Sequence, residues 1–88
     1  MQVKEIETFI SKIPDYPKPG ILFYDISTLL SNGRAFKSAI NHLETLCSKY
    51  EFDLVAGIDA RGFIFGSTLS CLLNKGFIMI RKENKLPL

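Results

Sequence analysis

The segment Asp59–Gly62 combines residue types and a setting that suit the binding of an anion. It follows a continuous apolar run, Leu54–Ile58, and precedes an apolar pattern with helical spacing over residues 63–73. A loop between the carboxyl end of a strand and the amino end of a helix is a common ligand site in α/β proteins. The start of a helix offers N–H groups and a positive partial charge, and Arg61 adds a planar fork of donors. We therefore predict an anion site at this loop.

A second basic segment is expected at the same edge. Another apolar run, Phe77–Ile80, follows the helix, and the order strand, helix, strand predicts a right-handed crossover between parallel strands. Continuous apolar runs indicate strands that are covered on both faces. Because parallel strands end at one edge, four cations would meet there: Arg61, Arg81, Lys82 and Lys85. A phosphate or diphosphate site is the functional interpretation, and a solvated basic rim is the alternative.

The first 33 residues predict a helix, a stiff loop and a short extended segment. Residues 3–13 have apolar side chains at helical spacing, and Pro14 should end that helix. Residues 14–20 hold three prolines and a glycine, which exclude a helix or a central strand. This stretch is either a linker or a preset loop that presents backbone groups to a ligand. Residues 21–24 suit a strand, 25–30 a short turn of helix, and 31–33 a turn before a helix over 34–49.

Composition narrows the classes of function. The 88 residues amount to one domain or part of one, and a net charge of +2 is too small to argue for a nucleic-acid surface. No apolar run is long enough to span a membrane and no signal peptide is visible, so we expect a cytoplasmic protein. Cys47 and Cys71 are expected to be buried, reduced thiols, and His42 an ordinary boundary residue. With one histidine and no Cys-x-x-Cys, no metal site is predicted from side chains.

Four blocks of the sequence resemble the adenine phosphoribosyltransferase family in order and spacing. They are residues 14–23 with Asp25-Ile-Ser27, residues 57–66, Ile80-Arg-Lys82, and Lys85-Leu-Pro87. The resemblance covers essentially the whole chain and implies a type I phosphoribosyltransferase fold, an α/β parallel sheet with flanking helices and an N-terminal hood. Residues 1–88 would be the N-terminal part of a single domain, with helix and hood over 1–33 and the first part of the core over 34–88.

The resemblance also implies an activity and a role for each block. The family forms AMP and diphosphate from adenine and phosphoribosyl diphosphate in purine salvage, with Mg²⁺ carried by that substrate, usually as a cytoplasmic homodimer. The base-binding residues would be Leu22, Phe23 and Tyr24, with backbone groups on the base edge and the Phe23 ring on its face. The diphosphate-binding residues would be Asp59, Ala60, Arg61, Gly62, Arg81, Lys82 and Lys85. The family tends to have a cis peptide at the start of that loop. Arg61 would stabilise charge in the transition state, and no residue is a convincing general base.

Two departures from the family pattern accompany the resemblance. Tyr24 stands where the family more often has arginine. The acidic pair and Gly/Thr-rich loop that bind the 5′-phosphate would lie beyond Leu88, so we expect residues 1–88 to be inactive alone. The alternatives are a non-catalytic domain of this fold that senses a nucleotide, or a naturally truncated, inert product.

Overall fold

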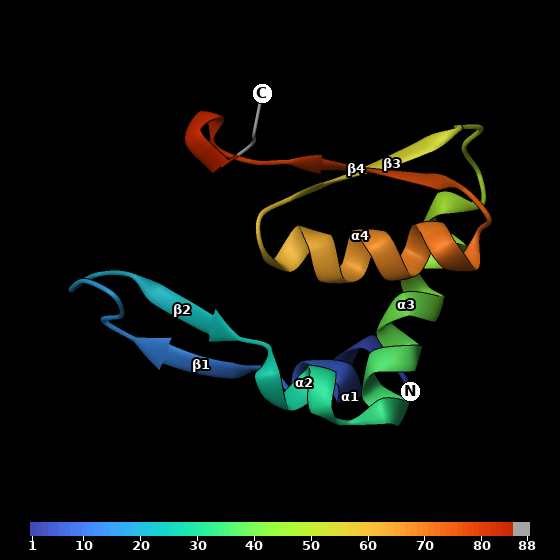
Figure 1. Cartoon of the computed structure of the whole chain (residues 1–88). Helices are drawn as coiled ribbons and strands as arrows, with labels where there is room; N and C mark the ends of the chain where they lie inside the picture. The colour runs from blue at the N-terminus through green and yellow to red at the C-terminus, as the bar shows by residue number, and fades with distance from the viewer. Residues whose placement is uncertain (86–88) are drawn as a thin grey trace. The chain divides into compact units, whose positions relative to one another are not determined.

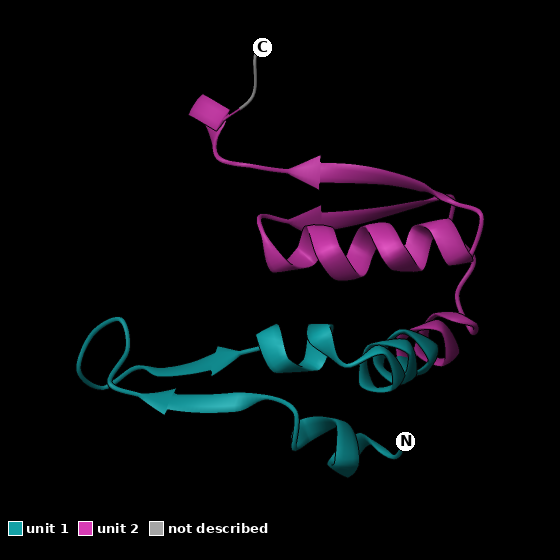
Figure 2. Ribbon diagram, turned by 60° about the horizontal axis from the view of Figure 1, so that its bottom comes forward, with its two compact units in different colours: residues 1–42 teal, residues 43–88 magenta. Residues whose placement is uncertain are grey.

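The computed structural model describes residues 1–85, and the chain divides into two compact units, Met1–His42 and Leu43–Leu88 (Figure 2). The elements in chain order are α1 (Val3–Glu7), β1 (Ser11–Pro14), β2 (Leu22–Asp25), α2 (Ser27–Ser31), α3 (Gly33–Cys47), β3 (Leu54–Ile58), α4 (Arg61–Leu72), β4 (Gly76–Ile80) and the 3₁₀ helix η1 (Glu83–Lys85) (Figure 1). Within residues 1–85, no helix is both long and apolar enough to cross a membrane. The predicted division of a single domain at residue 33 stays a prediction.

The first unit contains a β-hairpin where part of a helix was predicted. Helix α1 ends at Glu7, and Ser11–Pro14 pairs antiparallel with β2, placing Ile13 opposite Phe23. The prediction of a helix over residues 3–13 is therefore wrong beyond Glu7. The physical reason is tertiary, because β2 supplies the ladder that residues 11–14 join. Pro14 stands at the end of this strand, where a missing N–H is tolerated.

The proline-rich segment is the closed loop of that hairpin. The Tyr16 N–H donates to the Ile21 carbonyl at 3.1 Å, and the Gly20 N–H donates to Asp15 Oδ1 at 2.8 Å. Asp15 and Gly20 have φ angles of 57° and 87°, a region that Gly, Asn and Asp adopt most readily. The Tyr16 ring meets the Phe23 ring edge-on, with 5.2 Å between centroids. These contacts favour the preset loop over the linker.

The side chains of Asp25 and Asn32 accept hydrogen bonds at the starts of α2 and α3. Asp25 Oδ1 accepts hydrogen bonds from both the N–H and the hydroxyl of Ser27, at 2.9 and 2.8 Å, at the start of α2. Asn32 Oδ1 accepts from the Ala35 N–H at 3.0 Å and so caps α3, as the predicted turn at residues 31–33 requires.

His42 is half-buried, with Nε2 2.9 Å from the Met1 carbonyl oxygen, which confirms a boundary histidine. The buried apolar residues of this unit are Ile6, Leu29, Ala35 and Ile40.

The second unit contains the predicted strand, helix and strand. Strands β3 and β4 pair in parallel with Ile58 opposite Ile80, and α4 packs along one face of this sheet (Figure 1). Helix α4 begins at Arg61, two residues earlier than predicted, and ends at Leu72. The predicted crossover between parallel strands is confirmed.

Two predictions about burial in this unit are wrong. The strands were expected to be covered on both faces, but α4 covers one face, and Leu54, Ile58, Ile78, Met79 and Ile80 are about half or more exposed. Cys47 is half-buried and Cys71 is exposed, and both are free thiols. Cys71 is exposed although it follows the buried pair Leu69 and Ser70, because successive residues of a helix point in different directions.

Candidate functional site

The carboxyl ends of β3 and β4 come together through an ion pair. Asp59 follows β3 and Arg81 follows β4, and the register that pairs Ile58 with Ile80 sets the two residues side by side. Arg81 Nε donates to Asp59 Oδ2 at 3.1 Å, and each side chain is about one-third exposed. By the alternation of a strand, both side chains continue the face that α4 covers. The predicted meeting of the two strand ends at one edge is confirmed.

The main chain of Asp59 is also hydrogen-bonded to β4. Its N–H donates to the Ile80 carbonyl at 3.2 Å, so the amide and the carboxylate of Asp59 both bond to the end of the neighbouring strand. The peptide bond between Asp59 and Ala60 is cis, as the family resemblance implied. Ala60 occupies the N-cap position of α4, where no side-chain hydrogen bond caps the helix.

The connection between β3 and α4 is shorter than predicted. Arg61 is the first residue of α4, so only Asp59 and Ala60 lie between strand and helix. Arg61 and Gly62 therefore stand in the first turn, where N–H groups lack partners within the helix. The segment Asp59–Gly62 lines a groove of about 480 Å³ together with residues of β3 and α4. Arg61 is exposed at the start of the helix beside this groove.

Close packing sets the helix against the strands. A Cβ atom on Gly66 would lie 2.5 Å from the ring of Phe77 on β4, which confirms the predicted close approach at this glycine. An equally tight approach joins Gly57 of β3 to Gly62 of α4. The first turn of α4 is thereby held directly against the end of β3.

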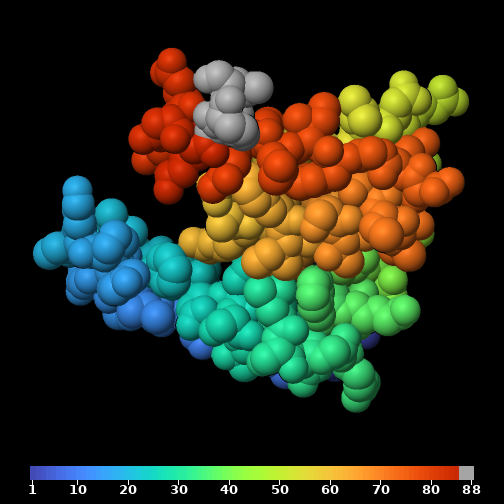
Figure 3. Space-filling model, viewed as in Figure 1, coloured from blue at the N-terminus to red at the C-terminus, as the bar shows by residue number. Residues whose placement is uncertain are grey.

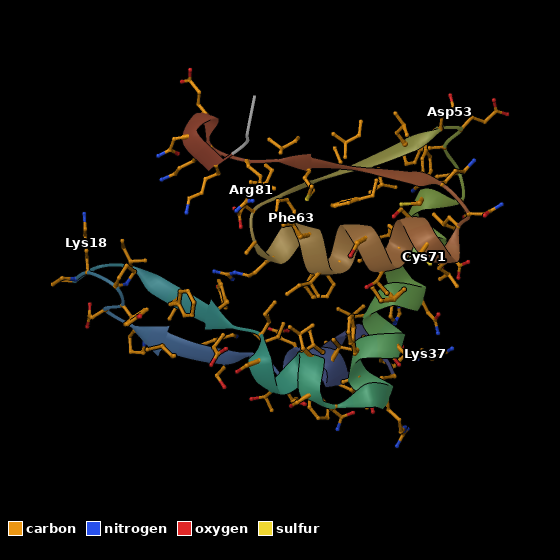
Figure 4. The ribbon with its side chains drawn as sticks, viewed as in Figure 1. Lys18, Lys37, Asp53, Phe63, Cys71 and Arg81 are labelled. Carbon is orange, nitrogen blue, oxygen red and sulfur yellow. The ribbon has the colours of Figure 1, made fainter. Side chains whose placement is uncertain are left out.

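Phe63 belongs to the site although sequence reasoning counted it only as the start of a helix. The guanidinium carbon of Arg81 lies 5.8 Å from the centroid of the Phe63 ring, within the range of a cation–π contact. Figure 4 shows both side chains at the same end of the sheet. An aromatic residue in the first turn after a strand, with an arginine after the next strand, was the available signal.

The remaining predicted cations follow Arg81 along the chain. Lys82 and Lys85 are exposed, and the Lys85 N–H, at the end of η1, donates to the carbonyl of Lys82, which precedes η1, at 2.9 Å. In the space-filling view, the red residues after β4 project next to the gold residues at the start of α4 (Figure 3). Contact of either lysine with an anion stays a prediction. Leu86 and Pro87 of the fourth sequence block lie outside the described residues.

Comparison with known proteins shows which enzymes this chain is similar to. No protein-family model matches the chain. A curated adenine phosphoribosyltransferase from Sulfurimonas denitrificans is 56% identical over 82 residues, which are 93% of this chain and 45% of that protein. The crystal structure of adenine phosphoribosyltransferase from Thermoanaerobacter pseudethanolicus superposes with a TM-score of 0.93 at 43% identity. It covers 98% of this chain and 51% of that one. In sequence and fold, this chain is similar to adenine phosphoribosyltransferases over nearly all of its residues.

The chain spans about half the length of the curated adenine phosphoribosyltransferases it matches. A further relative is the Saccharomyces cerevisiae enzyme, solved in complex with adenine and an imino-altritol bisphosphate. It has a TM-score of 0.83 and 35% identity, over 97% of this chain and 53% of that one. The fold expected from the resemblance, an incomplete type I phosphoribosyltransferase α/β sheet, is confirmed by these structures.

The residues that this family resemblance assigns to adenine lie in the first unit, on β2. Leu22 and Tyr24 are about half exposed, and Phe23 is half-buried against Tyr16. Within residues 1–85, β2 pairs only with β1, so one of its edges carries no strand. A strand edge presents backbone donors and acceptors at fixed spacing. The role of these three residues stays a prediction.

Proposed function

We propose that this chain is part of an adenine phosphoribosyltransferase, which forms AMP and diphosphate from adenine and 5-phosphoribosyl 1-diphosphate. The observation that carries the proposal is the ion pair of Arg81 with Asp59, which joins the ends of β3 and β4 beside Arg61 and the first turn of α4. The names of the relatives support the reaction, and the adenine in the yeast structure supports the base.

Arg61 is the residue that we expect to act on the leaving group. Displacement at the anomeric carbon passes through an oxocarbenium-like state, while negative charge builds up on the departing diphosphate. Arg61 is the first residue of α4, so its guanidinium and the N–H groups of the first turn would offer donors to that charge. Arg81 adds a second guanidinium, and Lys82 and Lys85 add exposed positive charge at the same edge.

Mg²⁺ is implied by the family, and the described residues do not build a site for it. Within residues 1–85, no group of three or more His, Cys, Asp or Glu side chains could hold a metal, and the carboxylate of Asp59 bonds to Arg81. Mg²⁺ in proteins is commonly held by one or two carboxylates plus phosphate oxygens. Mg²⁺ would then enter with the diphosphate of the substrate, and we derive no step through it.

Base recognition by backbone is the second part of the proposal. The outer edge of β2 would pair with the edge of adenine, and the Phe23 ring would pack on its face. If the backbone makes the polar contacts, Tyr24 in place of the family's arginine need not abolish binding of the base. Purine salvage, a cytoplasmic location and a homodimer complete the proposal, as the family implies.

An assay of the full-length protein that carries this chain tests the reaction. Adenine, hypoxanthine and guanine are each incubated with phosphoribosyl diphosphate and Mg²⁺, and nucleotide is measured by chromatography. We expect AMP, with the other bases used at least about a hundredfold less efficiently because unpaired polar groups penalise the wrong base. Binding of phosphoribosyl diphosphate without turnover would favour the nucleotide-sensing alternative. The same assay on residues 1–88 alone tests the expectation that they are inactive.

A further inference from the structure

We propose that Asp59 and Phe63 are positioning residues that hold the Arg81 guanidinium ready for the diphosphate, and that Asp59 itself does not contact the anion. This inference rests on the proposed function, because it names how one wall of the same site is built. The family resemblance suggests that Asp59 binds the anion itself. We infer instead that Asp59 orients Arg81, and that Arg81 binds the anion.

Both polar groups of Asp59 argue against direct contact with a diphosphate. A carboxylate repels a phosphate, so it fits an anion site only when a cation neutralises it. Arg81 does this, since its Nε donates to Asp59 Oδ2 at 3.1 Å. The other group that could bind an anion is the main-chain N–H, and this N–H donates to the Ile80 carbonyl at 3.2 Å. Asp59 can therefore favour anion binding only through Arg81.

Arg81 is held from two sides. Asp59 accepts from Nε, which fixes one edge of the guanidinium, while the Nη atoms carry the four other N–H donors. Two parallel N–H bonds from such a fork suit a phosphate. The Phe63 ring faces the guanidinium, with 5.8 Å between the guanidinium carbon and the ring centroid. An arginine restrained in this way loses less side-chain entropy when an anion binds.

The Phe63 ring is itself fixed by the packing of the sheet. It meets the Phe77 ring at 85°, with 6.1 Å between centroids. Phe77 in turn packs so closely on α4 that a Cβ atom on Gly66 would lie 2.5 Å from its ring. A continuous set of contacts thus runs from the helix backbone through two aromatic rings to Arg81. Each of these residues lies in the unit Leu43–Leu88.

The first experiment titrates inorganic diphosphate into the full-length protein in a calorimeter. Phe63→Leu keeps an apolar side chain but removes the ring, and we expect the Kd to rise about two- to fivefold. Phe63→Tyr keeps the ring and should restore the wild-type Kd. The matched control is Phe52→Leu, because Phe52 makes the same type of contact with Lys75, at 5.5 Å, before β3 begins. That variant should bind diphosphate like the wild type.

The second experiment asks whether Asp59→Asn raises or lowers the Kd for diphosphate. Asp59→Asn removes a negative charge from an anion site, which should tighten binding if Asp59 only repels the ligand. Our proposal predicts the opposite, a Kd at least about twofold higher, because Arg81 loses its charge-assisted hydrogen bond. In an Arg81→Ala background, neither Asp59→Asn nor Phe63→Leu should weaken binding any further. Thermal melts of all variants confirm that the fold is kept.

The outcomes separate this inference from the proposed function. Tighter or unchanged binding in Asp59→Asn, or a loss in Phe63→Leu that persists without Arg81, overturns the positioning role. If Asp59→Asn does not fold, the comparison of Phe63→Leu with and without Arg81 decides alone. A wild-type protein that neither binds diphosphate nor forms AMP overturns the proposed function instead.

Discussion

Gly57 and Gly62 approach so closely that a Cβ atom on Gly57 would lie 2.3 Å from the carbonyl oxygen of Gly62. Gly57 is the fourth residue of β3 and Gly62 the second of α4, so this approach joins the strand to the first turn of the helix. Arg61 precedes Gly62 directly. The position of the proposed catalytic arginine therefore depends on a backbone contact that only a residue without a side chain allows.

Gly57→Ala should lower the free energy of unfolding by about 1–3 kcal/mol, because the new methyl group meets backbone that no rotamer change can move away. Urea unfolding followed by circular dichroism measures it. Gly33→Ala is the control, since a Cβ atom there meets nothing within 4 Å. At this first residue of α3, alanine should be neutral or stabilise by up to about 1 kcal/mol. Equal stability of the two variants would contradict the packing described for Gly57.

Arg61→Ala in the full-length protein should lower kcat by about a hundred- to a thousandfold, as loss of a donor to transition-state charge does in other enzymes. Arg61→Lys should retain part of the activity, because it keeps the charge and loses the planar fork. Arg34→Ala, an exposed arginine near the start of α3, serves as the control. Wild-type turnover in Arg61→Ala would remove this residue from the mechanism.

Phe23→Ala should raise the KM for adenine about five- to 150-fold, because stacking of a base on an aromatic ring contributes about 1–3 kcal/mol. Phe23→Tyr keeps the ring and should stay near the wild-type value. The Kd for diphosphate should not change in either variant, since the diphosphate residues lie in the other unit. Steady-state kinetics with adenine varied gives the result, and an unchanged KM in Phe23→Ala would argue against β2 as the base-binding segment.

Asp15→Ala should loosen the hairpin loop by about 1 kcal/mol, because the Gly20 N–H loses the acceptor that it now has at 2.8 Å. Asp15→Asn should be nearly neutral, since asparagine offers an oxygen and tolerates the φ of 57° at this position. Hydrogen exchange of the Gly20 amide measures the difference. Exchange that is equally fast in both variants would mean that the side chain of residue 15 does not hold the loop.

The second unit was predicted closely because its signals are local. Strand β3 was predicted at its observed bounds, and α4 and β4 within two residues, since each apolar run is bounded by polar residues or glycine. The segment over residues 8–13 failed for the opposite reason. Phe9, Ile10 and Ile13 have helical spacing, but strand partners 8 to 14 residues further on decide the conformation of Ser11–Pro14. A local pattern carries no information about that partner.

The candidate site was predicted in outline and missed in its contacts. Parallel strands imply one shared edge, so the meeting of Asp59 and Arg81 at that edge followed from the order of elements. That Arg81 bonds to Asp59, instead of adding to a cluster of separate cations, depends on the one-to-one register of the strands. That Phe63 faces Arg81 depends on where α4 begins. Apolar periodicity predicts neither the register of the two strands nor the residue at which α4 begins.

The register of β3 and β4 makes this half of the site sensitive to chain length. Arg81 lies beside Asp59 because five residues of β3 pair with five of β4. A single residue inserted or deleted within either strand would turn one of the two side chains to the opposite face and separate the ion pair. The connection over residues 48–53, before β3, has no such constraint. Relatives should therefore vary in length there, while the spacing from Leu54 to Asp59 and from Gly76 to Arg81 stays constant.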